Sequence, residues 1–476
     1  MSRAQTNSRA TSPHDDMLCN LPRARTKMDE QQLDAIVGAT FLNSYYLSGA
    51  RSLFNEWCFS EPYEAAILPR DTDRAPTLVT LTSMLPALVG GAQTWMPNVC
   101  LYEWFSIDNT VEPADEGSDL GAAIGHFIDE RVTGKLENDI VSAAVGALKD
   151  LGLSRGRIGF DDLRFAGSIG EQLPDIEIVD AHSLFWDIRK VRSRRELELL
   201  SYAARANQAA LHTVIEEMRP GVNWRDLAYL YKDTWTRHGG RAVSDKGLLW
   251  GGRFKGQHIP DTFFMPDNDF EIDAGKYYVL EGEGHVLQYN ADASRTVFVG
   301  DPPADYLKGV DAVMRTYEAL EKTLLPGRSS KDAYKTGMAV MEAEGVPYPG
   351  KTLIITHGVG LEFVEWYTGF PTQRGIPESF ELEANMSIGM DCLYYGHTLG
   401  TFHFENGMVI TEDGPRSLYA PPNTDTVLHR GLVVRDGGTT DSYCPAIELR
   451  QEQGVPDWMT RREAPAPAAS WRPLSR

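Results

Sequence analysis

The sequence predicts two domains in tandem, an α/β domain followed by an α+β domain. Three observations lead to this fold class. With 476 residues, 42% of them hydrophobic, the chain is long enough to build two cores of ordinary size. From residue 29 to 190, short apolar runs alternate with amphipathic segments, which is typical of a small α/β domain. After residue 190, two amphipathic helices precede strand-like segments that each carry an acid or a histidine.

The N-terminal elements follow from their hydrophobic patterns. Residues 1 to about 28 are polar and are predicted to form a flexible arm ahead of a domain over residues 29–190. Helical periodicity predicts helices over two segments, Gln31–Ala39 and Glu130–Leu151. Short apolar runs predict strands over three, Glu64–Leu68, Thr77–Leu81 and Arg157–Phe160.

The second domain is predicted to span residues 191–450. It opens with a long amphipathic helix over Val191–Met218, which Pro220 and Gly221 end, and a second helix over Trp224–His238. Two later helices are predicted over Tyr306–Leu324 and Lys331–Glu344. The Pro/Ala-rich residues 451–476 are expected to form a flexible tail.

Five residues of metal-ligand type stand in apolar, strand-like contexts of the second domain. They are Glu281, Asp292, His357, Asp391 and Glu405. Four carboxylates and one imidazole suit two adjacent divalent cations, and this mixture favours Mn, Fe, Co or Zn. Two such ions activate water or polarise a bound carboxylate, so these residues are the candidate functional site.

Composition narrows the partners. There are 67 acidic and 46 basic residues, a net charge of −21, which argues against binding to nucleic acid or an anionic membrane surface. The five cysteines are scattered without a Cys-x-x-Cys pair and are expected to be free thiols in the reducing cytoplasm. No apolar run approaches 18 residues, and the N-terminus lacks the apolar region of a secretory signal.

The order and spacing of the five residues resemble the pita-bread superfamily of methionine aminopeptidase, aminopeptidase P, prolidase and creatinase. Asp292 opens an Asp-x-Ser-Arg-Thr segment and His357 opens His-Gly-Val-Gly-Leu. The resemblance covers residues 190 to 420 and implies a pita-bread catalytic domain in a homodimer. It also implies that Glu281 holds one ion, that His357 and Asp391 hold the other, and that Asp292 and Glu405 bridge them.

Several positions depart from the peptidase pattern. The superfamily usually has Asp at the place of Glu281 and Glu at the place of Asp391. Val364 stands where the peptidases have a second histidine, and Cys392 where they have a proline. The chain instead has Glu-Gly-Glu at 281–283, Glu365-Trp366 after the ligand histidine, and Leu-Leu-Trp-Gly-Gly-Arg at 248–253. In these details it resembles the pita-bread dimethylsulfoniopropionate lyases.

This finer resemblance implies a metal-dependent lyase that splits a small zwitterion, with dimethylsulfoniopropionate giving dimethyl sulfide and acrylate by β-elimination. A carboxylate must then remove a C–H proton, and its pKa should be raised in a partly dry pocket. Glu365 is the first candidate for this base and Glu362 the second; the alternative for Glu365 is a structural partner of His357. Two other functions stay open: a C–N hydrolase of the Xaa-Pro dipeptidase or creatinase type, and a non-catalytic binding module.

Further residues are candidates around the site. Glu283 is expected to support the ligands or act as an additional ligand, and Arg295 to orient Asp292. A sulfonium group would favour aromatic faces, although each aromatic residue is also a plausible core residue. The candidates for substrate contact are Trp57, Trp250, Trp366, Tyr394 and His403.

Overall fold

A computed structural model describes residues 17–435 except 59, 92–93, 104–118, 244–269, 366, 369–378, 397–399, 420–426 and 430–431. Trp250, Trp366 and the predicted tail lie outside the described residues. No helix in the described part of the chain is long and apolar enough to cross a membrane.

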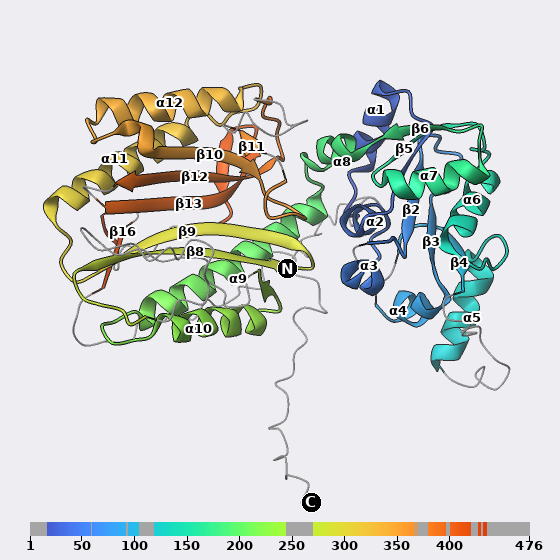
Figure 1. Ribbon diagram of the computed structural model, residues 1–476, viewed down its shortest axis with the longest axis horizontal. Coiled ribbons are helices and arrows are strands. Elements are labelled where there is room, and N and C mark those ends of the chain that lie inside the picture. The colour runs from blue at the N-terminus through green and yellow to red at the C-terminus, as the bar shows by residue number, and fades with distance from the viewer. Residues whose placement is uncertain are drawn as a thin grey trace, which may run out of the picture. The chain divides into compact units, whose positions relative to one another are not determined.

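The N-terminal domain is built on a six-stranded mixed sheet in the order β4-β3-β2-β1-β5-β6 (Figure 1). The central strand β1 pairs antiparallel with β2 and parallel with β5. The strands are β1 (Ala35–Gly38), β2 (Ala65–Pro69), β3 (Thr77–Leu81), β4 (Asn98–Tyr102), β5 (Arg157–Phe160) and β6 (Glu177–Asp180). The helices are α1 (Leu21–Glu30), α2 (Phe41–Ser48), α3 (Leu53–Trp57), α4 (Leu85–Gly90), α5 (Asp119–Arg131), α6 (Ile140–Asp150), α7 (Leu163–Gln172) and α8 (His182–Arg189).

Three predictions in this domain need correction. The expected arm reaches too far, because α1 lies within it and buries Leu21, Ala24 and Met28. The predicted helix over 31–39 is strand β1, since its apolar run is buried from both sides in the middle of the sheet. The predicted helix over 130–151 is two helices, because α5 ends at Arg131 and α6 begins after the N-cap Asp139.

The second domain contains a ten-stranded sheet in which β11-β10-β12-β13-β9-β16-β15 form the main path. Strand β8 pairs with β9 and with β7, and β14 pairs with β13. The strands are β7 (Arg241–Ala242), β8 (Lys276–Val286), β9 (Tyr289–Val299), β10 (Thr352–Gly358), β11 (Tyr367–Thr368), β12 (Ser387–Gly396), β13 (Gly400–Thr411), β14 (Gly414–Ser417), β15 (Val427–His429) and β16 (Leu432–Arg435).

Two helix pairs pack on this sheet. They are α9 (Arg194–Glu217) with α10 (Trp224–Arg237), and α11 (Ala304–Glu321) with α12 (Ser330–Ala343). The first pair packs against β8 and β9, and the second against β10, β12 and β13 (Figure 1). Helix α9 begins at Arg194, three residues after the predicted start at Val191, because Ser193 and Glu196 form a capping box in which each side chain accepts a hydrogen bond from the other's backbone N–H.

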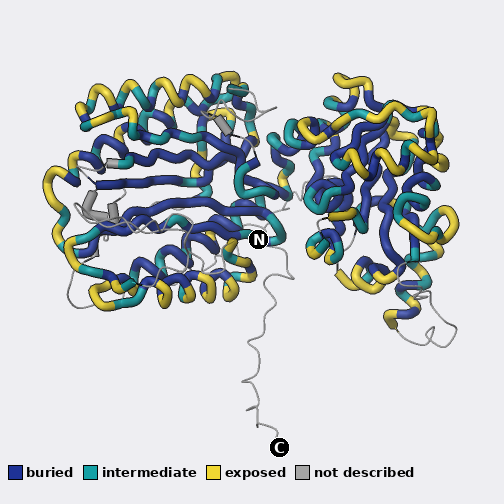
Figure 2. Tube along the Cα trace, viewed as in Figure 1, coloured by how far each residue is buried: buried dark blue, intermediate teal, exposed yellow. Residues whose placement is uncertain are grey.

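The alternation of side chains along the strands decides where the site lies. On β12 the residues Met390, Cys392 and Tyr394 belong to the core under α11 and α12. On β8, Gly282 lies against Leu211 of α9. Asp391 and Glu281, each next to one of these positions, point to the other face of the sheet. Figure 2 shows that the strands packed under the two helix pairs are buried, while the outer sides of the helices are exposed. The predicted order, an α/β domain followed by an α+β domain, is therefore confirmed.

Candidate metal centre

The cross-strand register gathers the predicted ligands on one face of the sheet. Glu281 on β8 is paired with Ser294 on β9, and Ser294 is paired with Glu405 on β13. Glu405 is paired in turn with Asp391 on β12. Directly paired residues share a face, so these carboxylates form a row across four strands.

The remaining polar residues join this row because residues two apart on a strand share a face. Asp292 stands two before Ser294, and His403 two before Glu405. On β10, His357 stands two after Ile355, the partner of Asp391. Three segments that are far apart in the sequence thus place their side chains in one cluster.

The imidazole of His357 contacts three carboxylates. Its Nε2 lies 3.4 Å from Asp292 Oδ2, 3.2 Å from Asp391 Oδ2 and 3.5 Å from Glu405 Oε1. Its Nδ1 lies 3.3 Å from the Gly358 carbonyl oxygen. An Nδ1–H donated to that carbonyl leaves the Nε2 lone pair for a metal ion.

His403 forms a second group of the same kind. Its Nε2 lies 2.9 Å from Asp391 Oδ1 and 3.9 Å from Glu405 Oε2, and its Nδ1 lies 3.2 Å from Glu281 Oε2. Two sets of ligand atoms are each close enough to hold one ion: Asp292, His357 and Glu405, and Asp391, His403 and Glu405. The two groups share Glu405.

The density of buried acids perturbs their ionisation. Burial and the neighbouring Asp391 raise the pKa of Glu405 to about 7. Burial and Glu281 raise the pKa of Glu283 to about 9. Burial alone would lower the pKa of His357, but the Asp391 and Glu405 carboxylates raise it to about 10. Buried carboxyl groups that lie close together resist ionising at the same time, because their negative charges repel each other. A bound cation relieves that repulsion.

Two further observations test whether divalent cations fit. Among the described residues, no hydrogen-bond donor serves Asp292 Oδ1 or either carboxylate oxygen of Glu405, although all three are buried. Buried oxygens of this kind need a partner, and a cation supplies one. Position 389 also has to be glycine, since a Cβ there would lie 2.5 Å from His357 Nε2 and 3.1 Å from Glu405 Oε1. The residues therefore fit two divalent cations.

Two carboxylates lie between the two imidazoles. Asp391 and Glu405 each turn one oxygen to His357 and the other to His403. The neighbouring strands β12 and β13 bring this pair together, because Asp391 and Glu405 are directly paired. Asp292 turns its Oδ2 to His357.

Glu365 and Glu362, the two candidate bases, are engaged with buried arginines. Glu365 forms ion pairs with Arg192 and, at 3.3 Å, with Arg189. Burial alone would raise the pKa of Glu365, but the two guanidinium groups lower it. Glu362 pairs with Arg189 and accepts a hydrogen bond of 3.0 Å from Trp186 Nε1. The raised pKa expected of Glu365 is wrong, since the charges around it favour its ionised form.

Arg189 and Arg192 are functional neighbours that the sequence reasoning missed. Both are buried, and their contacts tie the segment after His357 to the stretch that precedes α9. Their signal in the sequence is the basic cluster Arg-Lys-Val-Arg-Ser-Arg-Arg at 189–195.

The two residues expected to support the ligands take different positions. Glu283 is buried on the ligand face, directly opposite Asp292. Arg295 donates to the carbonyl oxygens of Ser294 and Glu405 at 2.8 and 2.7 Å. These hydrogen bonds join Arg295 to the backbone of the strand that carries Glu405.

Two of the aromatic candidates can be placed. Tyr394 is buried on the helix-covered face, and its hydroxyl donates to the Pro347 carbonyl oxygen, so it does not contact the ligand side. Trp57 lies at the end of α3 and is 65% exposed. Tyr395, one residue further, faces the ligands: burial and the charges of Glu281 and Asp391 raise its pKa to about 12.

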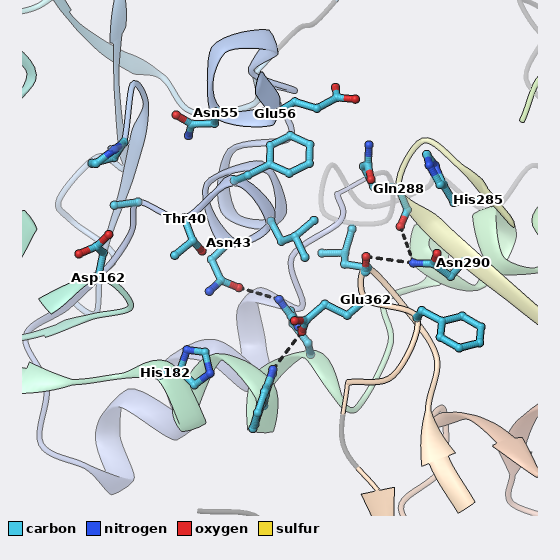
Figure 3. Close-up of a pocket in the computed structure, with 18 of the residues that line it drawn as sticks. Thr40, Asn43, Asn55, Glu56, Asp162, His182, His285, Gln288, Asn290 and Glu362 are labelled. Atoms are coloured by element: carbon cyan, nitrogen blue, oxygen red, sulfur yellow. Dashed lines mark hydrogen bonds and ion pairs between the residues drawn. The ribbon is translucent and has the colours of Figure 1, made fainter. Parts of the chain in front are cut away.

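Figure 3 shows a cavity of about 700 Å³ and the residues that line it. Its walls include Asn43, Glu56 and His182 of the N-terminal domain and Asn290 and Glu362 of the second domain. None of the ligand residues lines it, but Phe363 does, and the Phe363 ring centroid is 6.3 Å from that of His357. A volume of this size accommodates a small molecule.

Comparisons with known proteins agree with this geometry. Residues 198–412 match the model of metallopeptidase family M24. The chain is 24% identical over 234 residues to the Xaa-Pro dipeptidase of Pyrococcus furiosus, covering 49% of this chain and 64% of that protein. It is 24% identical over 218 residues to the ectoine hydrolase of Halomonas elongata, covering 42% of this chain and 52% of that protein.

Solved structures show the same fold. The X-Pro aminopeptidase of Thermotoga maritima superposes with a TM-score of 0.62 at 16% identity, covering 86% of this chain and all of that one. The relatives named here are peptidases and hydrolases, and the finer likeness to dimethylsulfoniopropionate lyases has no support among them. The chain thus shares the fold of these structures, and its residues 198–412, which carry the ligand cluster, match the family M24 model.

Proposed function

We propose that this protein is a metal-dependent hydrolase that cleaves a C–N bond in a small substrate. The observation that carries the proposal is the pair of imidazole–carboxylate groups sharing Glu405 on one face of an M24 fold. The names of the relatives, a dipeptidase and an ectoine hydrolase, support a hydrolase over a lyase.

The residues divide the work. Divalent cations in such a site polarise the bound substrate and lower the pKa of water. Asp292, Asp391 and Glu405 supply the negative charge that holds them. Glu283, opposite Asp292 on the same face, is placed to accept a proton from the attacking water. Arg295 keeps the Glu405 strand in register through its backbone bonds.

The substrate class follows from the cavity and from one missing side chain. The cavity of about 700 Å³ suits a dipeptide-sized or smaller molecule. Val364 occupies the place where the peptidases it resembles have a histidine that handles the scissile peptide. We therefore expect Xaa-Pro dipeptides to be poor substrates, and small cyclic amidines or N-acyl compounds to be better ones.

β-Elimination is the second candidate, and one observation favours it: Glu283 adds a buried carboxylate beside the ligands. The two bases first considered, Glu365 and Glu362, are held by arginines, so this route would depend on Glu283.

The test is a panel assay of the purified protein loaded with Mn, Co or Zn. It includes ectoine, N-acyl amino acids, Xaa-Pro dipeptides and dimethylsulfoniopropionate, with amine release and headspace dimethyl sulfide as readouts. Hydrolysis of an amidine or amide at about 10 per second supports the proposal. Dimethyl sulfide release without any C–N hydrolysis replaces the hydrolase proposal with the lyase.

A homodimer is also proposed, and light scattering on the eluted protein tests it.

A further inference from the structure

His403 lies in the cluster but is not one of the five metal-ligand residues that the sequence predicts. It is buried on β13, two residues before Glu405 and on the same face. Its backbone is held on both sides by one hydroxyl: Thr296 Oγ1 donates to the His403 carbonyl oxygen at 3.0 Å and accepts from the His403 N–H at 3.0 Å. The ring is therefore placed by the sheet itself.

The two ring nitrogens of His403 have distinct surroundings. Nδ1 lies 3.2 Å from Glu281 Oε2, while Nε2 faces Asp391 Oδ1 at 2.9 Å and Glu405 Oε2 at 3.9 Å. A metal-bound histidine donates its other ring N–H to a carboxylate or carbonyl, which fixes the tautomer. His357 shows the same division, with Nδ1 on the Gly358 carbonyl and Nε2 toward the carboxylates.

The shared carboxylates complete the geometry. Glu405 turns Oε1 toward His357 and Oε2 toward His403, and Asp391 likewise divides its two oxygens between the rings. A carboxylate that lies between two cations presents one oxygen to each. Asp391 and Glu405 thus mark two cation positions, one beside each imidazole.

We infer that His403 Nε2 is a ligand of the second divalent cation, and that Glu281 orients this ring through Nδ1 as well as contributing negative charge. The centre then has two imidazoles, one for each ion. This inference deepens the proposed function, on which it rests for the presence of two cations, and it favours Zn, Co or Fe over the harder Mg and Ca.

The inference also accounts for both unusual acids. Glu281 is one methylene longer than the aspartate usual at its place, and its carboxylate reaches the ring of His403. Asp391 is one methylene shorter than the usual glutamate, and the imidazole of His403 lies against its Oδ1. The longer acid at 281 and the shorter acid at 391 therefore both accommodate the second imidazole.

The experiment measures the metal content and the visible spectrum of the cobalt-substituted protein. The variant is His403→Asn, and His126→Asn on the exposed surface of α5 is the matched control. Wild type and the control are expected to bind about two Co ions per chain. His403→Asn is expected to bind about one ion tightly, with at least a tenfold weaker second site and altered d–d bands.

A second variant separates ligation from folding. Glu281→Gln removes the charge beside His403 Nδ1 and keeps an oxygen on a side chain of the same length, so it is expected to retain two ions with an affinity between those of wild type and His403→Asn. Circular dichroism of each variant checks the fold. Two ions with unchanged affinity and spectrum in His403→Asn would overturn the inference. A wild type that binds two ions but hydrolyses nothing refutes the proposed function and leaves the assignment of His403 standing.

Discussion

Replacing Glu365 by glutamine separates a structural ion pair from a catalytic base. The carboxylate of Glu365 and the guanidinium of Arg192 are both completely buried, and Arg189 lies 3.3 Å from Glu365. Glutamine removes the negative charge and leaves two buried guanidinium groups less compensated. Breaking a buried ion pair costs about 3–5 kcal/mol of unfolding free energy.

The expected loss lies at the lower end of that range, about 3 kcal/mol, because Arg192 keeps other partners. Its guanidinium lies 3.5 Å from Glu196 and donates to Ser387 Oγ at 2.7 Å and to the Val359 carbonyl at 3.1 Å. The assay is urea unfolding at a fixed metal concentration. The matched control is Glu198→Gln on helix α9, which breaks the ion pairs of Glu198 with Arg194 and Arg195 at the surface. It should lower the unfolding free energy by about 0.5 kcal/mol or less.

The loss depends on pH with a definite sign. The pKa of Glu365 is lowered in the folded protein, so its charge stabilises the fold above the unfolded-state pKa of about 4.3. That contribution disappears as the pH falls through the lowered folded-state value. The difference between wild type and Glu365→Gln should therefore be full at pH 7 and shrink below pH 4. A variant as stable as wild type that loses activity per bound metal would refute this reasoning and make Glu365 the base.

Three further predictions concern the metal centre. Glu405→Ala should remove both ions, while Asp292→Ala should weaken the binding of only the ion beside His357. Plasma mass spectrometry of dialysed protein measures the metal content. Equal losses in the two variants would contradict the shared role of Glu405. Gly389→Ala should lose metal binding because its Cβ would displace the His357 ring, and isothermal titration with Zn measures the loss. Chelated protein should lose stability as the pH rises from about 4 to 9, because Glu405 and Glu283 keep their protons in the folded protein up to about pH 7 and pH 9, whereas the unfolded chain releases them near pH 4. Thermal melting over that range measures the loss, and a flat profile would be the contrary result.

Much of the fold was predictable from local signals. The capping box at Ser193, the periodicity of α9 to α12 and the strand-like runs around the five ligands depend on neighbours in sequence, so their positions follow from the sequence. Local pattern failed for β1, where an apolar run of four residues is buried between two other strands. An apolar run this short is compatible with a helix or a strand, and only the pairing with β2 and β5 decides between them.

The sequence by itself predicted five of the residues that meet in the cluster, because motif order and spacing reflect the five strands that carry them. Only the tertiary structure decided how the roles divide. That Asp391 and Glu405 lie between the two rings depends on the register of β12 with β13, which no spacing along the chain encodes. The structure likewise shows Glu365 in a buried ion pair and His403 within the cluster, which the sequence pattern did not predict. Ionisation and ligation depend on charges brought together across the fold, so neither could be obtained from one segment alone.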